Sequence, residues 1–118
     1  MKALIILVVG LLSVGCLTPE QKALRDSIVG EYERKKDGTT YKLVLLEDGI
    51  VLSYHNSKKY DEGNWSISNG QIHFMDEDGD IGVCRINKDK SLSTIAIIFD
   101  GKRTDLPKKE QDTFKKIK

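Results

Sequence analysis

Pairs of Asp or Asn followed by Gly recur along most of this chain, and they constrain its fold more than any other feature. Glycine adopts the positive φ that two-residue hairpin turns require, and Asn and Asp tolerate it. The pairs are Asp37-Gly38, Asp48-Gly49, Asn69-Gly70, Asp78-Gly79 and Asp100-Gly101. A chain that reverses direction at such short intervals builds antiparallel strands joined by tight connections.

Between these turns, apolar and polar side chains alternate, as in Tyr41-Leu43-Leu45 and Ile50-Leu52-Tyr54. A period of two buries one face of a strand and exposes the other. We expect about eight short strands, at residues 29–35, 39–47, 50–56, 62–68, 71–76, 80–87, 91–99 and 112–117. This order predicts an all-β antiparallel up-and-down meander that closes into a small barrel, with a two-sheet β-sandwich as the alternative.

A short helix is expected before the first strand, from Pro19 to Ile28. Thr18 can cap it, Pro19 suits the first turn and Gln21 occupies the capping-box position. Its narrow apolar stripe is enough to plug or flank one end of the barrel. Near the other end of the chain, Leu106-Pro107 predicts a turn or a single helical turn before the last strand.

The large aromatic side chains of the strands are expected to fill the barrel rather than to line a ligand cavity. A domain of about 100 residues has little apolar material to spare for its core. The residues are Tyr32, Tyr41, Tyr54, Trp65, Phe74, Phe99 and Phe114.

The N-terminus has a different character. Lys2 precedes an apolar run that ends in Ser13-Val14-Gly15-Cys16. The run is shorter than the roughly 20 residues that a helix needs to cross a bilayer. A basic residue, a short apolar stretch and small residues before a cut are typical of a cleaved signal peptide.

This segment resembles the signal sequence of a bacterial prolipoprotein, with Ser13 where a leucine is usual. The resemblance implies cleavage before Cys16 and lipid attachment, including palmitate, at Cys16. It implies a lipid-anchored protein of the cell envelope, in the outer membrane if the host has two, because Leu17 rather than Asp follows the cysteine. The small residues also fit the ordinary secretory peptidase, which would leave a secreted or periplasmic protein. The expected domains are a signal peptide at 1–15, a lipidated N-terminus and short helix at 16–28, and the barrel at 29–118.

The charges predict no nucleic-acid partner. The chain has 19 basic and 18 acidic residues, and removal of Lys2 with the signal peptide makes the two numbers equal. The signs alternate along the chain, so no basic stripe forms. Cys84, in a strand-like run, is expected to be a small buried hydrophobe, or to pair with Cys16 if that residue is not acylated.

No motif for catalysis, cofactor binding or metal binding is present. The chain lacks a Gly-x-Ser-x-Gly elbow, a phosphate-binding glycine loop and an HExxH pair. The acidic run 76–80 fails as an EF-hand loop, because its glycine is fourth and its twelfth residue is Asn87. It is expected to be a hairpin tip, and His55 and His73 are expected to be exposed. We therefore expect no enzyme activity, no cofactor and no metal.

Two tripeptides, Gly30-Glu31-Tyr32 and Gly63-Asn64-Trp65, place a glycine two residues before a large aromatic. Lipocalin-type barrels begin with a similar Gly-x-Trp, so residues 29–117 resemble small lipocalin-like bacterial lipoproteins. A simpler interpretation is that glycine relieves crowding beside a neighbouring strand. We expect a non-enzymatic binding or interaction module with a partner protein in the envelope, or alternatively a lipocalin-like carrier of a small apolar ligand.

Overall fold

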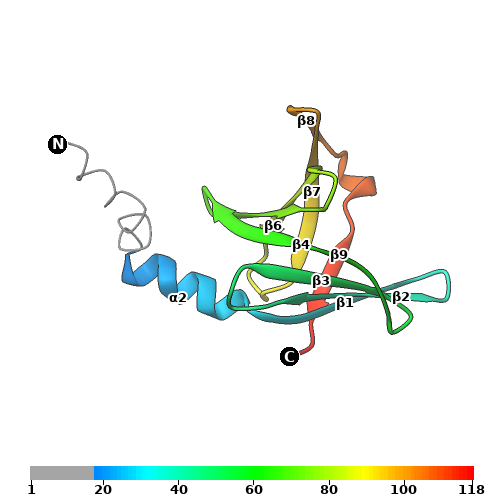
Figure 1. The fold of residues 1–118 in the computed structure, drawn as a ribbon, viewed down its shortest axis with the longest axis horizontal. Helices are drawn as coiled ribbons and strands as arrows, with labels where there is room; N and C mark the ends of the chain where they lie inside the picture. The colour runs from blue at the N-terminus through cyan, green and yellow to red at the C-terminus, as the bar shows by residue number, and fades with distance from the viewer. Residues whose placement is uncertain (1–17) are drawn as a thin grey trace.

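The computed structural model describes residues 18–118, which form one short helix and a closed antiparallel β-barrel (Figure 1). The predicted signal peptide and Cys16 lie outside the described residues. The elements are α2 (Pro19–Ile28), β1 (Gly30–Lys36), β2 (Thr39–Leu45), β3 (Ile50–His55), β4 (Lys58–Ser68), β5 (Gln71–Met75), β6 (Ile81–Ile86), β7 (Leu92–Phe99), β8 (Lys102–Asp105), the 3-10 turn η1 (Lys108–Glu110) and β9 (Thr113–Lys116). The prediction of an up-and-down barrel is confirmed.

Eight of the strands form the ring. β1 to β7 pair consecutively, and β9 returns to pair with both β1 and β7. β8 pairs with the second half of β7, so the β7–β8 hairpin projects away from the barrel (Figure 1). The sequence prediction missed β8 and placed residues 100–105 in a connection. Its side chains are all exposed, so β8 has no buried face and no alternating pattern to detect.

Three of the five predicted Asp-Gly and Asn-Gly turns have the expected geometry, whereas in Asp48-Gly49 and Asp78-Gly79 only the glycine has a positive φ. In the Asp37-Gly38, Asn69-Gly70 and Asp100-Gly101 pairs both residues have positive φ, as a type I′ turn requires. Asn56-Ser57, between β3 and β4, has the same geometry without a glycine. It therefore allows β4 to begin at Lys58, four residues before the predicted start.

The two ends of the barrel differ. Helix α2 reaches the end that holds the β2–β3 turn, where the Arg25 guanidinium donates to the carbonyl of Glu47. The predicted capping box is present, with Thr18 and Gln21 bonded to each other's backbone N–H groups. Ile28, the last helical residue, is fully buried in the core and Leu24 packs against it, whereas most of the helix is exposed, so α2 flanks this end through its C-terminal half.

The core fills the half of the barrel next to α2. Tyr32, Leu45, Trp65, Ile72 and Leu92 are each at most 3% exposed. The two polar aromatics have partners: the Tyr32 hydroxyl donates to the carbonyl of Ile28, and Trp65 Nε1 donates to that of Leu46 at 2.9 Å. Burial raises the pKa of Tyr32 to about 12, so this phenol stays neutral and keeps its hydrogen bond.

The expectation that all aromatic side chains of the strands fill the barrel is wrong for Phe99. It is 65% exposed, because β7 has by then left the ring to pair with β8. Tyr41 and Tyr54 are half-buried, whereas Phe74 and Phe114 pack partly against the core and partly line a cavity.

The glycines of β4 and β6 give a matched test of the packing. A Cβ on Gly63 would meet the carbonyl oxygen of Met75 at 2.2 Å, whereas a Cβ on Gly82 would meet nothing within 4 Å. We expect Gly63→Ala to lower the free energy of unfolding by about 1–3 kcal/mol through overpacking. Gly82→Ala should leave it unchanged or raise it slightly. Urea unfolding of both variants checks this, and equal effects would contradict the close approach of β4 and β5.

Candidate functional site

The end of the barrel opposite α2 opens into a cavity of about 340 Å³. This end carries the β1–β2, β3–β4 and β5–β6 turns, which in an up-and-down ring lie away from the turns next to the helix. Val51 and Cys84, at 4% and 3% exposure, belong to the core and form its inner wall. Met75 and Ile97, each 43% exposed, lie at the opening. We call this feature the cup.

The wall of the cup is mostly apolar. It includes Leu43, Phe74, Ile81 and Phe114 from four different strands. Gly82, which follows Ile81, leaves open space where a side chain would otherwise stand. The expectation that side chains fill the whole barrel is therefore wrong for this half.

A β-bulge in β7 brings both Thr94 and Ile97 to the cup. Val83 pairs with Ala96 and Cys84 pairs with Thr94, so Ile95 is an extra residue. Three positions of regular strand would put Thr94 and Ile97 on opposite faces. The bulge shifts the alternation by one residue, which strict period-two reasoning could not anticipate.

A second bulge shapes the rim. Ser53 pairs with Asp61 and Tyr54 pairs with Lys59, so Tyr60 is the extra residue in β4. Its ring lies against His55, with centroids 3.8 Å apart, and His55 meets Tyr41 edge-on at 4.7 Å. His55 is exposed, as expected, and belongs to this aromatic group, whereas His73 on β5 is half-buried.

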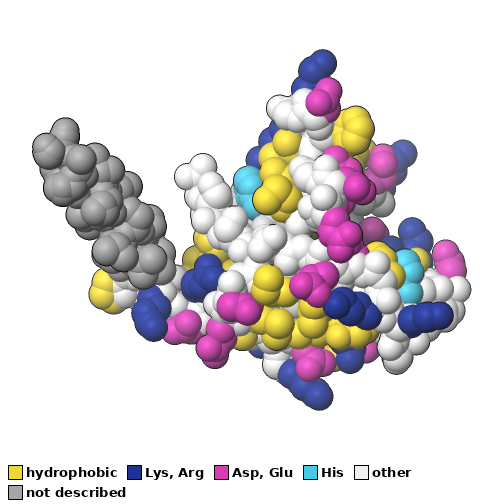
Figure 2. Space-filling view, in the orientation of Figure 1, with side chains coloured by type: hydrophobic (Ala, Val, Ile, Leu, Met, Phe, Trp, Pro, Cys, Tyr) yellow, Lys and Arg dark blue, Asp and Glu magenta, His cyan; other side chains and the backbone are white. Residues whose placement is uncertain are grey.

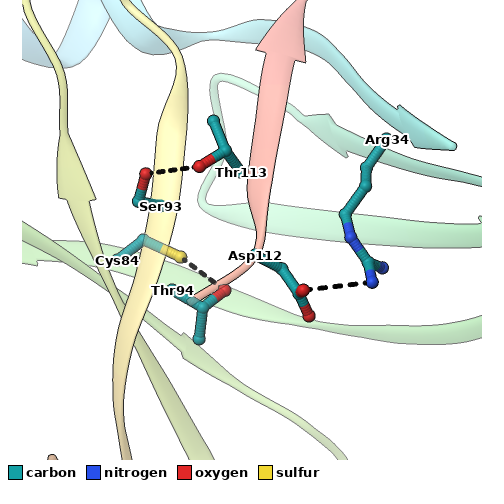
Figure 3. Close-up of polar contacts among 6 residues, drawn as sticks. All are labelled: Arg34, Cys84, Ser93, Thr94, Asp112 and Thr113. Atoms are coloured by element: carbon teal, nitrogen blue, oxygen red, sulfur yellow. Dashed lines mark hydrogen bonds and ion pairs between the residues drawn. The ribbon is translucent and has the colours of Figure 1, made fainter. Parts of the chain in front are cut away.

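The polar side chains near β7 and β9 are paired with one another, and Cys84 and Thr94 are the two of them that line the cup (Figure 3). The Cys84 thiol lies 3.7 Å from the Thr94 hydroxyl, and Ser93 and Thr113 share a hydrogen bond of 2.8 Å. Arg34 on β1 forms an ion pair of 3.1 Å with Asp112, just before β9. The arrangement offers no activated nucleophile.

Cys84 is a buried thiol, as expected. Burial raises its pKa from 9.0 to about 11, with the hydrogen bond to Thr94 acting in the opposite direction. The neutral thiol is thus the stable form at physiological pH.

Three carboxylates line the cup, from Asp61, Asp76 and Asp80. Asp76 Oδ1 accepts from the backbone N–H groups of Asp78 and Asp80, which confirms the predicted hairpin tip. Within residues 18–118, no group of three His, Cys, Asp or Glu side chains is placed to share a metal ion. Asp61 belongs to no recognised motif and was not predicted as a site residue, although the period-two series Trp65, Gly63 and Asp61 on β4 indicates that its side chain faces inward.

No protein-family model matches this chain, and comparison with curated proteins and with solved structures finds no match either. No helix in the described part of the chain is both long and apolar enough to cross a membrane.

The burial of Cys84 predicts slow thiol labelling. In a Cys16→Ala chain, a disulfide reagent at pH 8 should modify Cys84 at least ~100-fold more slowly in the folded than in the urea-unfolded protein, because reaction needs local opening and an ionised thiol. Because the folded pKa is raised, the rate should stay low as the pH rises through 9.0, where an exposed thiol would be half ionised. Equal labelling of folded and unfolded chains would place this thiol at the surface.

Proposed function

We propose that this protein is a lipid-anchored module of the cell envelope that binds a small, largely apolar molecule in the open cup of its barrel. The cup is the single observation that carries the binding proposal. Its volume of about 340 Å³ lies within the range of small-molecule sites, which are concave and mostly apolar with a few polar groups. A barrel filled with side chains to both ends would offer no such site.

The anchor rests on the sequence alone. The apolar run before Cys16 and the small residues preceding that cysteine support lipidation, and two acyl chains suffice for stable membrane attachment. Cys16 is close in sequence to α2, whose last residues pack against the filled end of the barrel. A tether in this position leaves the cup unobstructed, so we infer that the ligand enters from the aqueous side.

A partner protein in the envelope is the second candidate. The observation that favours it is the β7–β8 hairpin, in which Phe99 is 65% exposed and β8 pairs on one side only. An unpaired strand edge can accept an extended segment of another chain. This surface lies on the projecting hairpin, so the two candidates can be tested separately.

The anchor is tested by Cys16→Ala. We expect the wild-type protein to sediment with membranes and the variant to appear in the soluble fraction, because the attachment atom is gone. Mass spectrometry of the wild-type mature N-terminus should show acyl groups on Cys16. An unmodified cysteine, or a variant that remains on the membrane, would contradict lipid anchoring through this residue.

The cup is tested by Gly82→Leu, which places a side chain in open space in its wall. The Cys16→Ala chain should enhance the fluorescence of the neutral probe phenylnaphthylamine, and Gly82→Leu in the same background should reduce the probe's affinity at least ~tenfold by filling the site. Gly82→Ala is the matched control, with little added volume and little expected effect. Undiminished binding to Gly82→Leu would show that the probe binds elsewhere.

A further inference from the structure

The charges in the wall of the cup all have the same sign. Asp61, Asp76 and Asp80 contribute carboxylates, and no Lys, Arg or His is among the lining residues. The chain as a whole is almost neutral, with a formal charge of +1. A wholly acidic lining is therefore a local property of the cup and not a consequence of composition. In Figure 2, acidic side chains gather along the middle of the face, between β6–β8 and β1–β3.

Two of these carboxylates are not neutralised by the protein. Asp61 and Asp80 form no ion pair with any residue of the described chain, whereas Asp112, just before β9, is paired with Arg34. One carboxylate oxygen of Asp76 already accepts two backbone hydrogen bonds within the β5–β6 turn. Lys59, the cation nearest to Asp61 in sequence, is bound to Glu62 at 2.7 Å.

Both unpaired carboxylates are half-buried beside apolar side chains. Partial loss of water disfavours the charged form of a carboxyl group unless a cation or a donor compensates. The raised pKa of Asp80 reflects this, through burial first and then repulsion from Asp76 and Asp78. A positive charge at the rim would relieve both effects.

Arg34 does not supply that charge. Its guanidinium lies 5.9 Å from the ring centroid of Phe114, a residue of the cup wall, but it is held by Asp112 at 3.1 Å. Below the rim, the lining is apolar or aromatic apart from Ser53, Cys84 and Thr94, and the Cys84 and Thr94 side chains are bonded to each other. An anion would meet three carboxylates at the entrance and no free cation in the wall.

From this complementarity we infer that the ligand of the cup is a small cationic amphiphile, an ammonium group joined to an apolar ring or short chain. The ammonium lies at the rim against Asp61 and Asp80, and the apolar part contacts Val51, Phe74 and Phe114. This inference rests on the proposed binding function and specifies the class of ligand. A charge-assisted hydrogen bond to carboxylate gives orientation, and burial of the apolar part gives most of the affinity.

The test uses three ligands that share one ring and differ in charge: naphthylmethylamine, naphthylmethanol and naphthoate. They are titrated by calorimetry at pH 7 into the full chain carrying Cys16→Ala. We expect the amine to bind at least ~tenfold more tightly than the alcohol, and the naphthoate to bind more weakly than either. Asp61→Asn and Asp80→Asn should each lower the affinity for the amine by more than the affinity for the alcohol, so that the preference for the amine falls.

Asp100→Asn is the matched control. It removes the same charge at an exposed turn with positive φ, a conformation that Asn adopts readily, and it should not change the preference. Equal affinity for amine and alcohol would overturn the cationic assignment and leave the cup as an apolar site. An amine preference that survives both rim substitutions would overturn the assignment to Asp61 and Asp80. Failure of all three ligands to bind would overturn the proposed binding function together with this inference.

Discussion

The structure depends on the closure of its ring by one four-residue strand. β9 pairs with β1 through Tyr32 and Lys116, and with β7 through Leu92 and Phe114. Flanking backbone bonds extend both seams, from Thr94 N to the carbonyl of Asp112 at 2.9 Å and from Ile117 N to that of Glu31 at 2.8 Å. Without β9, the edges of β1 and β7 would be open and the interior would face water along one side.

The same closure explains why only one end of the barrel is filled. β9 pairs with β7 only at Leu92 and Ser93, and from Ala96 onward the edge of β7 pairs with β8 instead. The ring is therefore fully hydrogen-bonded next to α2, where the core lies. Toward the other end β7 stays paired with β6 but no longer with β9, and the apolar side chains that face inward there line a space instead of filling it. The cup and the projecting hairpin both arise because one edge of β7 pairs with β9 over its first part and with β8 over its second part.

Much of this architecture was predictable from local sequence, because turns, caps and alternation are local signals. The Asp-Gly and Asn-Gly pairs, the capping box of Thr18 and Gln21, and the alternating runs led to the helix and to a closed barrel. The cup could not be predicted in the same way. It depends on the extra residues Ile95 and Tyr60, which shift the alternation, and on β8, which has no buried face. Asp61 is four residues from the buried Trp65 on the same strand, so the period of two predicts that its side chain faces inward. Its lack of a cationic partner is visible only when the other strands are in place.

The most direct test of this account is a measurement of the two seams made by β9. In NMR spectra of the folded protein, we expect cross-strand nuclear Overhauser effects between Tyr32 and Lys116 and between Leu92 and Phe114, with slow exchange of the amide of Ile117. Absence of these contacts, with β9 amides exchanging at unprotected rates while β1 and β2 remain protected, would show an open sheet, and the cup would have no far wall.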